Sequence, residues 1–375
     1  MLIRQNEIIP KSGSRYYQKT KRLDLSILIP YELFSKLDKK GKYLLVVNKM
    51  LSAINNTDSK NLVRKQVYSL LQMFKKRLNP NFDPEWELNA MTKLLVKECK
   101  NSIRLYIKGS LKDGTGKTHV GGVPDVPEDF EWPFYNTEIF NPVDKYSHER
   151  KDLPLYFIAQ FNCKDLAKYD KEGLLPKEGM LSFFYDLNEM KWGIEPEDKG
   201  FIRVYWFENT EKLHPATLPE GLDEDYIIPM MRVRMREEVS YPAYEDVDVC
   251  SLPLYDDDLY EKALKNLKVK EKDDISKLLG WPEDWQGSMF EEVEDVTNGN
   301  SDENEDSDLP FEQQQKRAQE ARGKWQLLFQ LDSLDSEEDN FDIMFGDAGS
   351  IYFFIPKDDL SKRRFDRVWM ILQCM

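Results

Sequence analysis

The chain has 375 residues and a formal net charge of −15, and 41% of its residues are hydrophobic and 12% aromatic. This length and apolar content predict a mostly globular protein with two or three domains. No run of about 18 apolar residues occurs, which excludes a transmembrane helix. The first residues lack the apolar core of a secretory signal and the four cysteines form no C-x-x-C pair, so a reduced, cytoplasmic setting is predicted.

The charge is divided unevenly along the chain. Residues 1–115 carry 23 basic and 10 acidic residues, a net of +13, so the remainder carries −28. Such asymmetry indicates either two modules with different partners or two modules that partly neutralise each other. Both interpretations stay open at this point.

Residues 1–102 are predicted to form a basic helical module. Apolar residues recur at helical spacing over 59–78, with lysines and arginines opposite, and 83–100 opens with Asp-Pro and ends in lysines. A basic helix face is compatible with nucleic acid, but no base-reading or aromatic pattern accompanies it. Packing within the protein is therefore the favoured interpretation.

The stretch GTGKT, residues 114–118, resembles part of a phosphate-binding loop. Leu111 stands where the first glycine of G-x-x-x-x-G-K-[ST] is required. Two glycines and two prolines follow, which excludes the helix whose N-terminus would hold the phosphate. The pattern predicts a turn, with a backbone nest for a small anion as the alternative.

Residues 103–375 are predicted to form a β-rich domain, in a fold of the α+β, mainly β class. Short segments rich in β-branched and aromatic residues, bounded by Gly, Pro and Asp, indicate strands at 103–109, 154–161, 179–187, 201–208, 231–236, 325–332, 350–355 and 365–373. Helices are predicted at 256–271 and 273–280. The acidic stretch 291–308 is predicted to be a disordered loop.

The segment MRVRMR places Arg232, Arg234 and Arg236 on one face of a strand. An amphipathic strand with arginines near acidic groups explains this pattern. A binding site for an anion or substrate is the alternative.

The chain also matches itself at a shift of 170 residues. Gln160 falls on Gln330, Gly179 falls on Gly349, and Phe183 falls on Phe353. The pattern predicts an internally duplicated β domain, with one repeat at about 150–210 and the other at about 320–375. Each copy ends a strand with a glutamine, Gln160 or Gln330, for which either a structural turn or a ligand contact is expected.

Six segments carry a family resemblance: GGVPDVPEDFEWP, LPLYFIAQFNCKDL, LPKEGMLSFFYD, KLLGWPEDWQG, LLFQLDS and FGDAGSIYFFIPKDDL. Over roughly residues 115–375, in this order, they resemble the YwqG-like family of uncharacterised bacterial proteins. The resemblance implies a β roll, preceded here by a helical extension, and no particular reaction. The characteristic residues it carries over are Gly121, Gly122, Pro124, Pro127, Trp132, Pro133, Gln160, Gly179, Gln330, Asp332, Asp347 and Gly349.

Residues that could perform chemistry are sparse. The three histidines lack metal-site spacing, so neither a metal nor a cofactor is predicted. The weak catalytic candidates are His119, Asp332 and Asp347, against turn roles for all three. Trp281 and Trp285 form either a stacking platform for a ligand or simple packing.

Two functional hypotheses follow. The favoured one is a non-enzymatic module whose acidic surface binds a basic protein, in the manner of an immunity protein that neutralises a toxin. The alternative is an enzyme of unknown class acting on a small anionic substrate. Whether the protein is an enzyme, its oligomeric state and the identity of a partner are left open by the sequence.

Overall fold

The computed structural model describes residues 84–140, 148–247, 257–270, 275–299, 311–336 and 338–374. The helices predicted before residue 84, and residues 300–308 of the acidic stretch 291–308, lie outside these ranges. The chain divides into two compact units. One contains Met1–Leu95, Val247–Lys270 and Asn304–Arg317, and the other contains Val96–Asp246, Glu271–Glu303 and Ala318–Met375.

Two helices of the sequence prediction are confirmed. Helix α5 (Pro84–Glu98) begins with a proline in its first turn and has Lys97 in its last. Helix α7 (Asp257–Asn266) falls within the predicted range 256–271.

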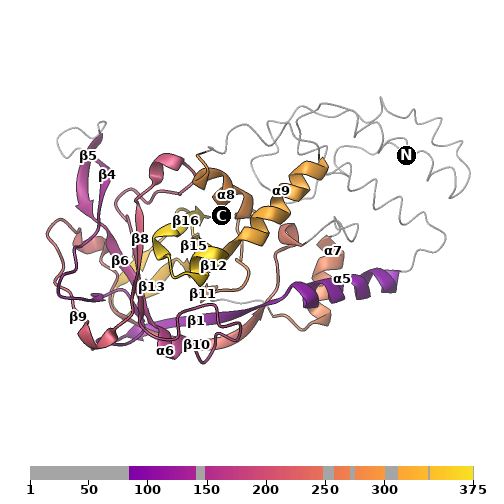
Figure 1. The fold of residues 1–375 in the computed structure, drawn as a ribbon, viewed down its shortest axis with the longest axis horizontal. Coiled ribbons are helices and arrows are strands. Elements are labelled where there is room, and N and C mark those ends of the chain that lie inside the picture. Colours follow the sequence, from indigo (N-terminus) through magenta and orange to yellow (C-terminus); the bar gives the residue numbers. More distant parts are fainter. Residues whose placement is uncertain are drawn as a thin grey trace, which may run out of the picture. The chain divides into compact units, whose positions relative to one another are not determined.

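The larger unit is built around a ten-stranded antiparallel sheet that is nearly closed (Figure 1). Its strands, in sheet order, are β16 (Trp369–Gln373), β15 (Ser350–Pro356), β12 (Trp325–Asp332), β11 (Lys277–Leu278), β1 (Lys100–Ser110), β10 (Met231–Ser240), β2 (His119–Val120), β6 (Tyr156–Asn162), β7 (Met180–Tyr185) and β8 (Ile202–Phe207). The mainly β prediction is confirmed, and every predicted strand segment contains a strand of this sheet.

Shorter strands form additional ladders outside this sheet. Three two-stranded ladders are β3 (Asp125–Val126) with β9 (His214–Pro215), β4 (Phe134–Phe140) with β5 (His148–Pro154), and β13 (Leu334–Ser336) with β14 (Phe341–Ile343). The other α-helices of the described residues are α6 (Cys163–Leu166), α8 (Phe290–Thr297), α9 (Phe311–Lys324) and α10 (Lys357–Ser361).

Two local predictions were wrong. No helix forms over residues 275–280, because Lys277 and Leu278 pair with β1 on one side and with β12 on the other. The start of the acidic stretch is not a loop but helix α8, whose Phe290, Val293 and Val296 are buried at helical spacing.

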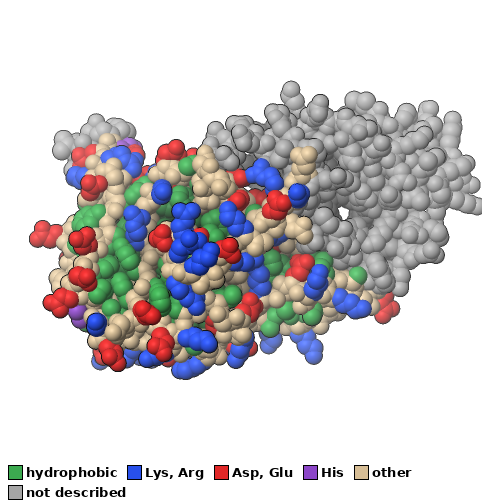
Figure 2. Space-filling model, in the orientation of Figure 1, with side chains coloured by type: hydrophobic (Ala, Val, Ile, Leu, Met, Phe, Trp, Pro, Cys, Tyr) green, Lys and Arg blue, Asp and Glu red, His purple; other side chains and the backbone are tan. Residues whose placement is uncertain are grey.

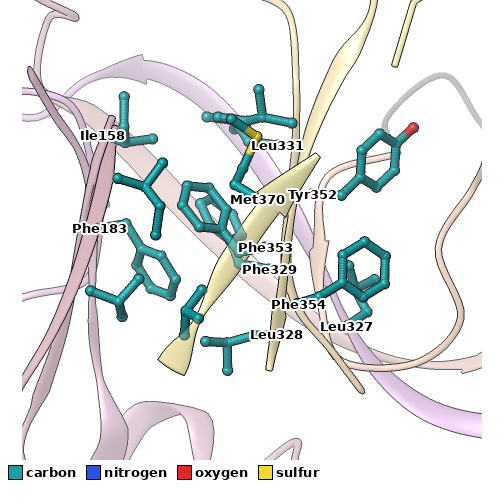
Figure 3. Packing of buried hydrophobic residues seen from close by; sticks show 14 of the residues in the cluster. Ile158, Phe183, Leu327, Leu328, Phe329, Leu331, Tyr352, Phe353, Phe354 and Met370 are labelled. Carbon is teal, nitrogen blue, oxygen red and sulfur yellow. The ribbon is translucent and has the colours of Figure 1, made fainter. Parts of the chain in front are cut away.

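The interior of the sheet is filled by aromatic side chains that come from its two ends. Phe183 of β7 lies 4.9 Å from Phe329 of β12 and 5.2 Å from Phe353 of β15, measured between ring centroids. Phe161 of β6 lies 5.1 Å from Phe329. Figure 3 shows Phe183 facing Phe329 and Phe353 across this interior. Strands far apart in the sheet order therefore share one core, which requires the sheet to roll up.

The edge of β16 is covered by a short segment, Trp192–Gly193. The amide of Leu372 donates to the carbonyl of Trp192 at 2.9 Å, and the indole of Trp369 donates to the carbonyl of Gly193 at 2.7 Å. Gly193 has a φ of +74°, and a Cβ at this position would overlap the carbonyl oxygen of Met370. Only glycine meets both requirements.

We expect Gly193→Ala to destabilise the fold by about 3 kcal/mol, because it combines left-handed backbone strain with a clash against fixed backbone. Gly173→Ala is the matched control, since Gly173 has a φ of +67° and open space around its Cβ. The control should cost only about 1 kcal/mol. Denaturant unfolding of both variants measures the difference, and equal losses would contradict the proposed close approach.

Candidate functional site

The side chain of Gln160, on strand β6, is hydrogen-bonded to the GTGKT segment and to Asp125. Its side chain is fully buried. The amide nitrogen donates to the carbonyl of Lys117 at 2.9 Å and to Oδ2 of Asp125 at 2.6 Å. The amide oxygen accepts from the backbone N–H of Asp125 at 2.8 Å. All three bonds are internal, so these contacts match the structural role expected for Gln160.

The GTGKT turn is closed on the protein's own groups. The backbone N–H of Gly116 donates to Oδ2 of Asp125 at 2.8 Å, and the side-chain amide of Asn162 donates to the carbonyl of Gly116. The N–H of Asn162 in turn donates to the hydroxyl of Thr118. Because the Gly116 N–H already has a carboxylate partner, these contacts favour the turn over an anion nest.

His119 is buried beside this turn. Its Nδ1 lies 2.8 Å from the carbonyl oxygen of Gly121, so Nδ1 carries the proton of the neutral ring. The ring packs edge-on against Phe157, and Nε2 has no hydrogen-bond partner among the described residues. Burial lowers the pKa of His119. A neutral histidine with no exposed surface is poorly placed to act on a substrate.

Gln330 occupies the corresponding position in the other half of the sheet. Gln160 is paired with His119 across β6 and β2, and Gln330 is paired with Lys277 across β12 and β11. Gln330 is also fully buried, but among the described residues its oxygen accepts a single bond, from the N–H of Glu283 at 3.1 Å. Its Nε2 has no hydrogen-bond partner in the described part of the chain.

The two tryptophans of GWPEDWQG have different surroundings. Trp281 is buried, its indole donates to the carbonyl of Glu98, and the Nζ of Lys100 lies 3.5 Å from its ring centroid. Trp285 is 40% exposed, and its indole donates to the hydroxyl of Ser350. They do not form a shared platform, because only Trp285 presents surface to solvent.

The weak catalytic candidates are held in separate places. Oδ1 of Asp332 accepts from the N–H of Ser333 and from the hydroxyl of Ser350, at the end of β12. Asp347 is exposed in the turn before β15. His119 lies on β2, which three other strands separate from β12 in the sheet order. In the described ranges, no group of three His, Cys, Asp or Glu could hold a metal ion.

The alternation predicted for MRVRMR is confirmed. Arg232, Arg234 and Arg236 are exposed along β10, while Val233 and Met235 are half-buried and pack on the core. The arginines lie along the strand surface, and a ligand for them stays a prediction.

A surface that sequence reasoning missed combines aromatic rings with carboxylates. We call it the acid-rimmed aromatic surface. Its rings lie on or against β7 and β8 and are Phe130, Trp132, Tyr205 and Phe207. Its exposed carboxylates lie close to these rings along the chain and are Glu128, Asp129, Glu131, Glu208 and Glu211.

The ladder of β3 with β9 joins the two acidic segments of this surface. Val126 pairs with His214, and Phe130 packs edge-on against Phe207 at 5.9 Å. Figure 2 shows apolar side chains gathered over β8, with acidic side chains beside them. The alternation of acidic and aromatic residues in PEDFEWP was the available signal, but the pairing with residues 208–215 depends on the fold.

Three comparisons bear on identity. A model of the family described as a domain of unknown function (DUF1963) matches residues 118–374. A model described as Immunity protein 44 matches residues 1–79. No curated protein matches the chain. Among the helices that the structure describes, none is long and apolar enough to cross a membrane.

Gln160→Leu should destabilise the fold by about 2 to 4 kcal/mol, because it leaves the N–H and the carboxylate of Asp125 without their buried partner. Gln330→Leu is the matched substitution in the other half and removes one bond, so about 1 kcal/mol is expected. Denaturant unfolding compares the two variants. A larger loss of stability in Gln330→Leu would contradict the conclusion that Gln160 contributes more to stability than Gln330.

The lowered pKa of His119 makes stability dependent on pH. The unfolded chain binds this proton more tightly than the folded one, so stability is lost as the pH falls below the unfolded pKa of about 6.5. The loss attributable to His119 should reach up to about 1.4 kcal/mol per pH unit. Unfolding of wild type and His119→Gln between pH 7.5 and 5.5 measures it, and parallel curves would show that His119 is not responsible.

Proposed function

The chain belongs to the DUF1963 family, and we propose that it is a non-enzymatic protein-binding module of the immunity type, working in the cytoplasm. Its acid-rimmed aromatic surface binds a basic protein partner, such as a cationic toxin. The observation that carries this proposal is the gathering of five exposed carboxylates, Glu128, Asp129, Glu131, Glu208 and Glu211, beside a cluster of aromatic rings.

The chemistry of that surface suits protein recognition. Aromatic residues are enriched at the centres of protein interfaces, where they bury large areas at low entropic cost. The two acidic segments, 127–131 and 208–215, contain one lysine, Lys212, so their potential is strongly negative. Such a field steers a basic protein to the surface and fixes its orientation.

The immunity-type assignment draws support from the first 79 residues, which match the Immunity protein 44 model. That match is independent of the charge argument, because it concerns a different part of the chain. The nature of the partner is inferred from charge alone.

The enzymatic alternative has less support. Asp332 is engaged by Ser333 and Ser350, and His119 is buried, so these groups are not free to share a substrate. Burial also raises the pKa of the Cys163 thiol to about 12, which makes that thiol a poor nucleophile.

The internal duplication and the YwqG-like assignment belong to the same proposal. All six motifs fall inside the matched span. The amide of Cys163 donates to the carbonyl of Gly179, and the amide of Ser333, 170 residues later, donates to the carbonyl of Gly349. The strand sets β6–β7–β8 and β12–β15–β16 both run as antiparallel meanders. These parallels support two copies of one unit.

The test is a charge reversal on the surface. We expect wild-type protein, captured from its own cells at low salt, to retain one basic protein in stoichiometric amount and to release it as salt is raised. The triple variant Glu128→Lys, Asp129→Lys and Glu131→Lys should retain at least about tenfold less, since each rim charge affects encounter and orientation.

The matched control is Asp335→Lys, Asp342→Lys and Asp347→Lys, which makes the same charge change at exposed positions around β13 and β14. It should bind the partner as wild type does. Equal loss of partner binding in both triple variants would show that net charge alone is responsible, which contradicts the proposed surface. Retention of the partner by the rim variant would also overturn it.

A further inference from the structure

A groove runs along the gap between the two edge strands of the sheet. It has a volume of about 1200 Å³. One wall contains Ile202–Val204 of β8, and the other contains the start of α10 and residues 364–369, which lead into β16. The end of α8 and the residues around Gly323 close the remaining side. Every lining residue belongs to the same compact unit as the sheet.

The groove is basic although the matched domain is acidic overall. Its basic residues are Lys199, Arg203, Lys324, Lys357, Arg364 and Arg367. Its acidic residues are Asp358, Asp359 and Asp366. Figure 2 shows Lys and Arg side chains gathered over the region of β15 and β16, beside the apolar patch over β8.

Three of these cations, Lys199, Arg203 and Lys357, make no ion pair with a carboxylate of the described residues. The guanidinium of Arg203 donates to the carbonyls of Gly200 and Ile202, at 3.1 and 2.8 Å. The Nζ of Lys357 donates to the carbonyl of Gly323 at 2.7 Å. Lys199 and Arg203 make no ion pair with any residue in the described ranges. Hydrogen bonds to backbone carbonyls therefore hold the side chains of Arg203 and Lys357 in place without neutralising their positive charges.

The other cations of the groove already have partners. Asp359 pairs with Arg364 and Arg367, and Lys324 pairs with Glu294. Burial lowers the pKa of Lys357, and the charge of Glu172 offsets only part of that shift. The unbalanced charge thus lies around Lys199, Arg203 and Lys357.

The floor of the groove restricts the kind of ligand. Its aromatic residues, Phe201, Trp325, Phe365 and Trp369, are all buried. No ring of the floor is therefore free to stack on a base, which is how single-stranded nucleic acids are usually held. Arginine forks and lysine charges recognise phosphate and carboxylate oxygens.

We propose that this groove binds a compact multivalent oxyanion, of the phosphate-chain or polycarboxylate kind, held by Lys199, Arg203 and Lys357. The site is distinct from the acid-rimmed aromatic surface, and an anion here would leave the proposed protein partner free to bind there. A bound anion supplies the negative charge that these three cations lack.

The test uses tripolyphosphate and citrate as probes, titrated into the full chain by calorimetry at low salt. We expect saturable binding of one anion per chain. The double variant Arg203→Ala with Lys357→Ala should weaken it about tenfold or more, as the loss of charge-assisted bonds requires. Binding of tripolyphosphate alone assigns the site to phosphates, and comparable binding of citrate assigns it to oxyanions in general.

The matched control is Lys164→Ala with Lys168→Ala, which removes the same charge at exposed positions in and after α6. It should bind the probes as wild type does. Because Lys357 also contacts the end of α9, the single variant Arg203→Ala serves if the double variant fails to fold. Absence of saturable binding, or equal weakening in the control, overturns the proposal. A single-stranded oligonucleotide that binds more tightly than either anion and depends on Arg203 overturns it in favour of nucleic acid.

Discussion

The fold depends on one constraint: the aromatic residues of the two ends of the sheet must bury each other. Phe183 near one edge and Phe353 near the other lie 5.2 Å apart, with Phe329 within reach of both. Either three-stranded meander alone would leave these rings exposed to water. Rolling the sheet places them in one interior, and the rest of the architecture follows from that closure.

Closure determines where polar groups are needed. Within the described residues, the side chain of Gln160 makes three hydrogen bonds that hold a loop on the sheet, whereas that of Gln330 makes one. The half that contains Gln330 instead relies on Glu283, which pairs with both Lys277 and Arg104. The two halves thus resemble each other in backbone pairing but differ in the chemistry that stabilises the turns.

Closure also separates two surfaces of opposite charge. The outer face of β7 and β8 carries aromatic rings with an acidic rim, while the gap beside the edge of β8 carries uncancelled cations. The proposed protein partner and the proposed anion would therefore bind to separate surfaces.

The sequence by itself determined eight of the ten strands of the main sheet, the mainly β class, helices α5 and α7 and the exposure of the arginines on β10, because periodicity and local propensity are properties of neighbouring residues. It missed β2, α8 and α9. It mistook β11 for a helix, since the pairing of Lys277 with Gln330 overrides the local preference of that segment. The same limit applies to the candidate sites. The acid-rimmed aromatic surface and the basic groove join residues up to about 170 positions apart, which only the tertiary structure brings together.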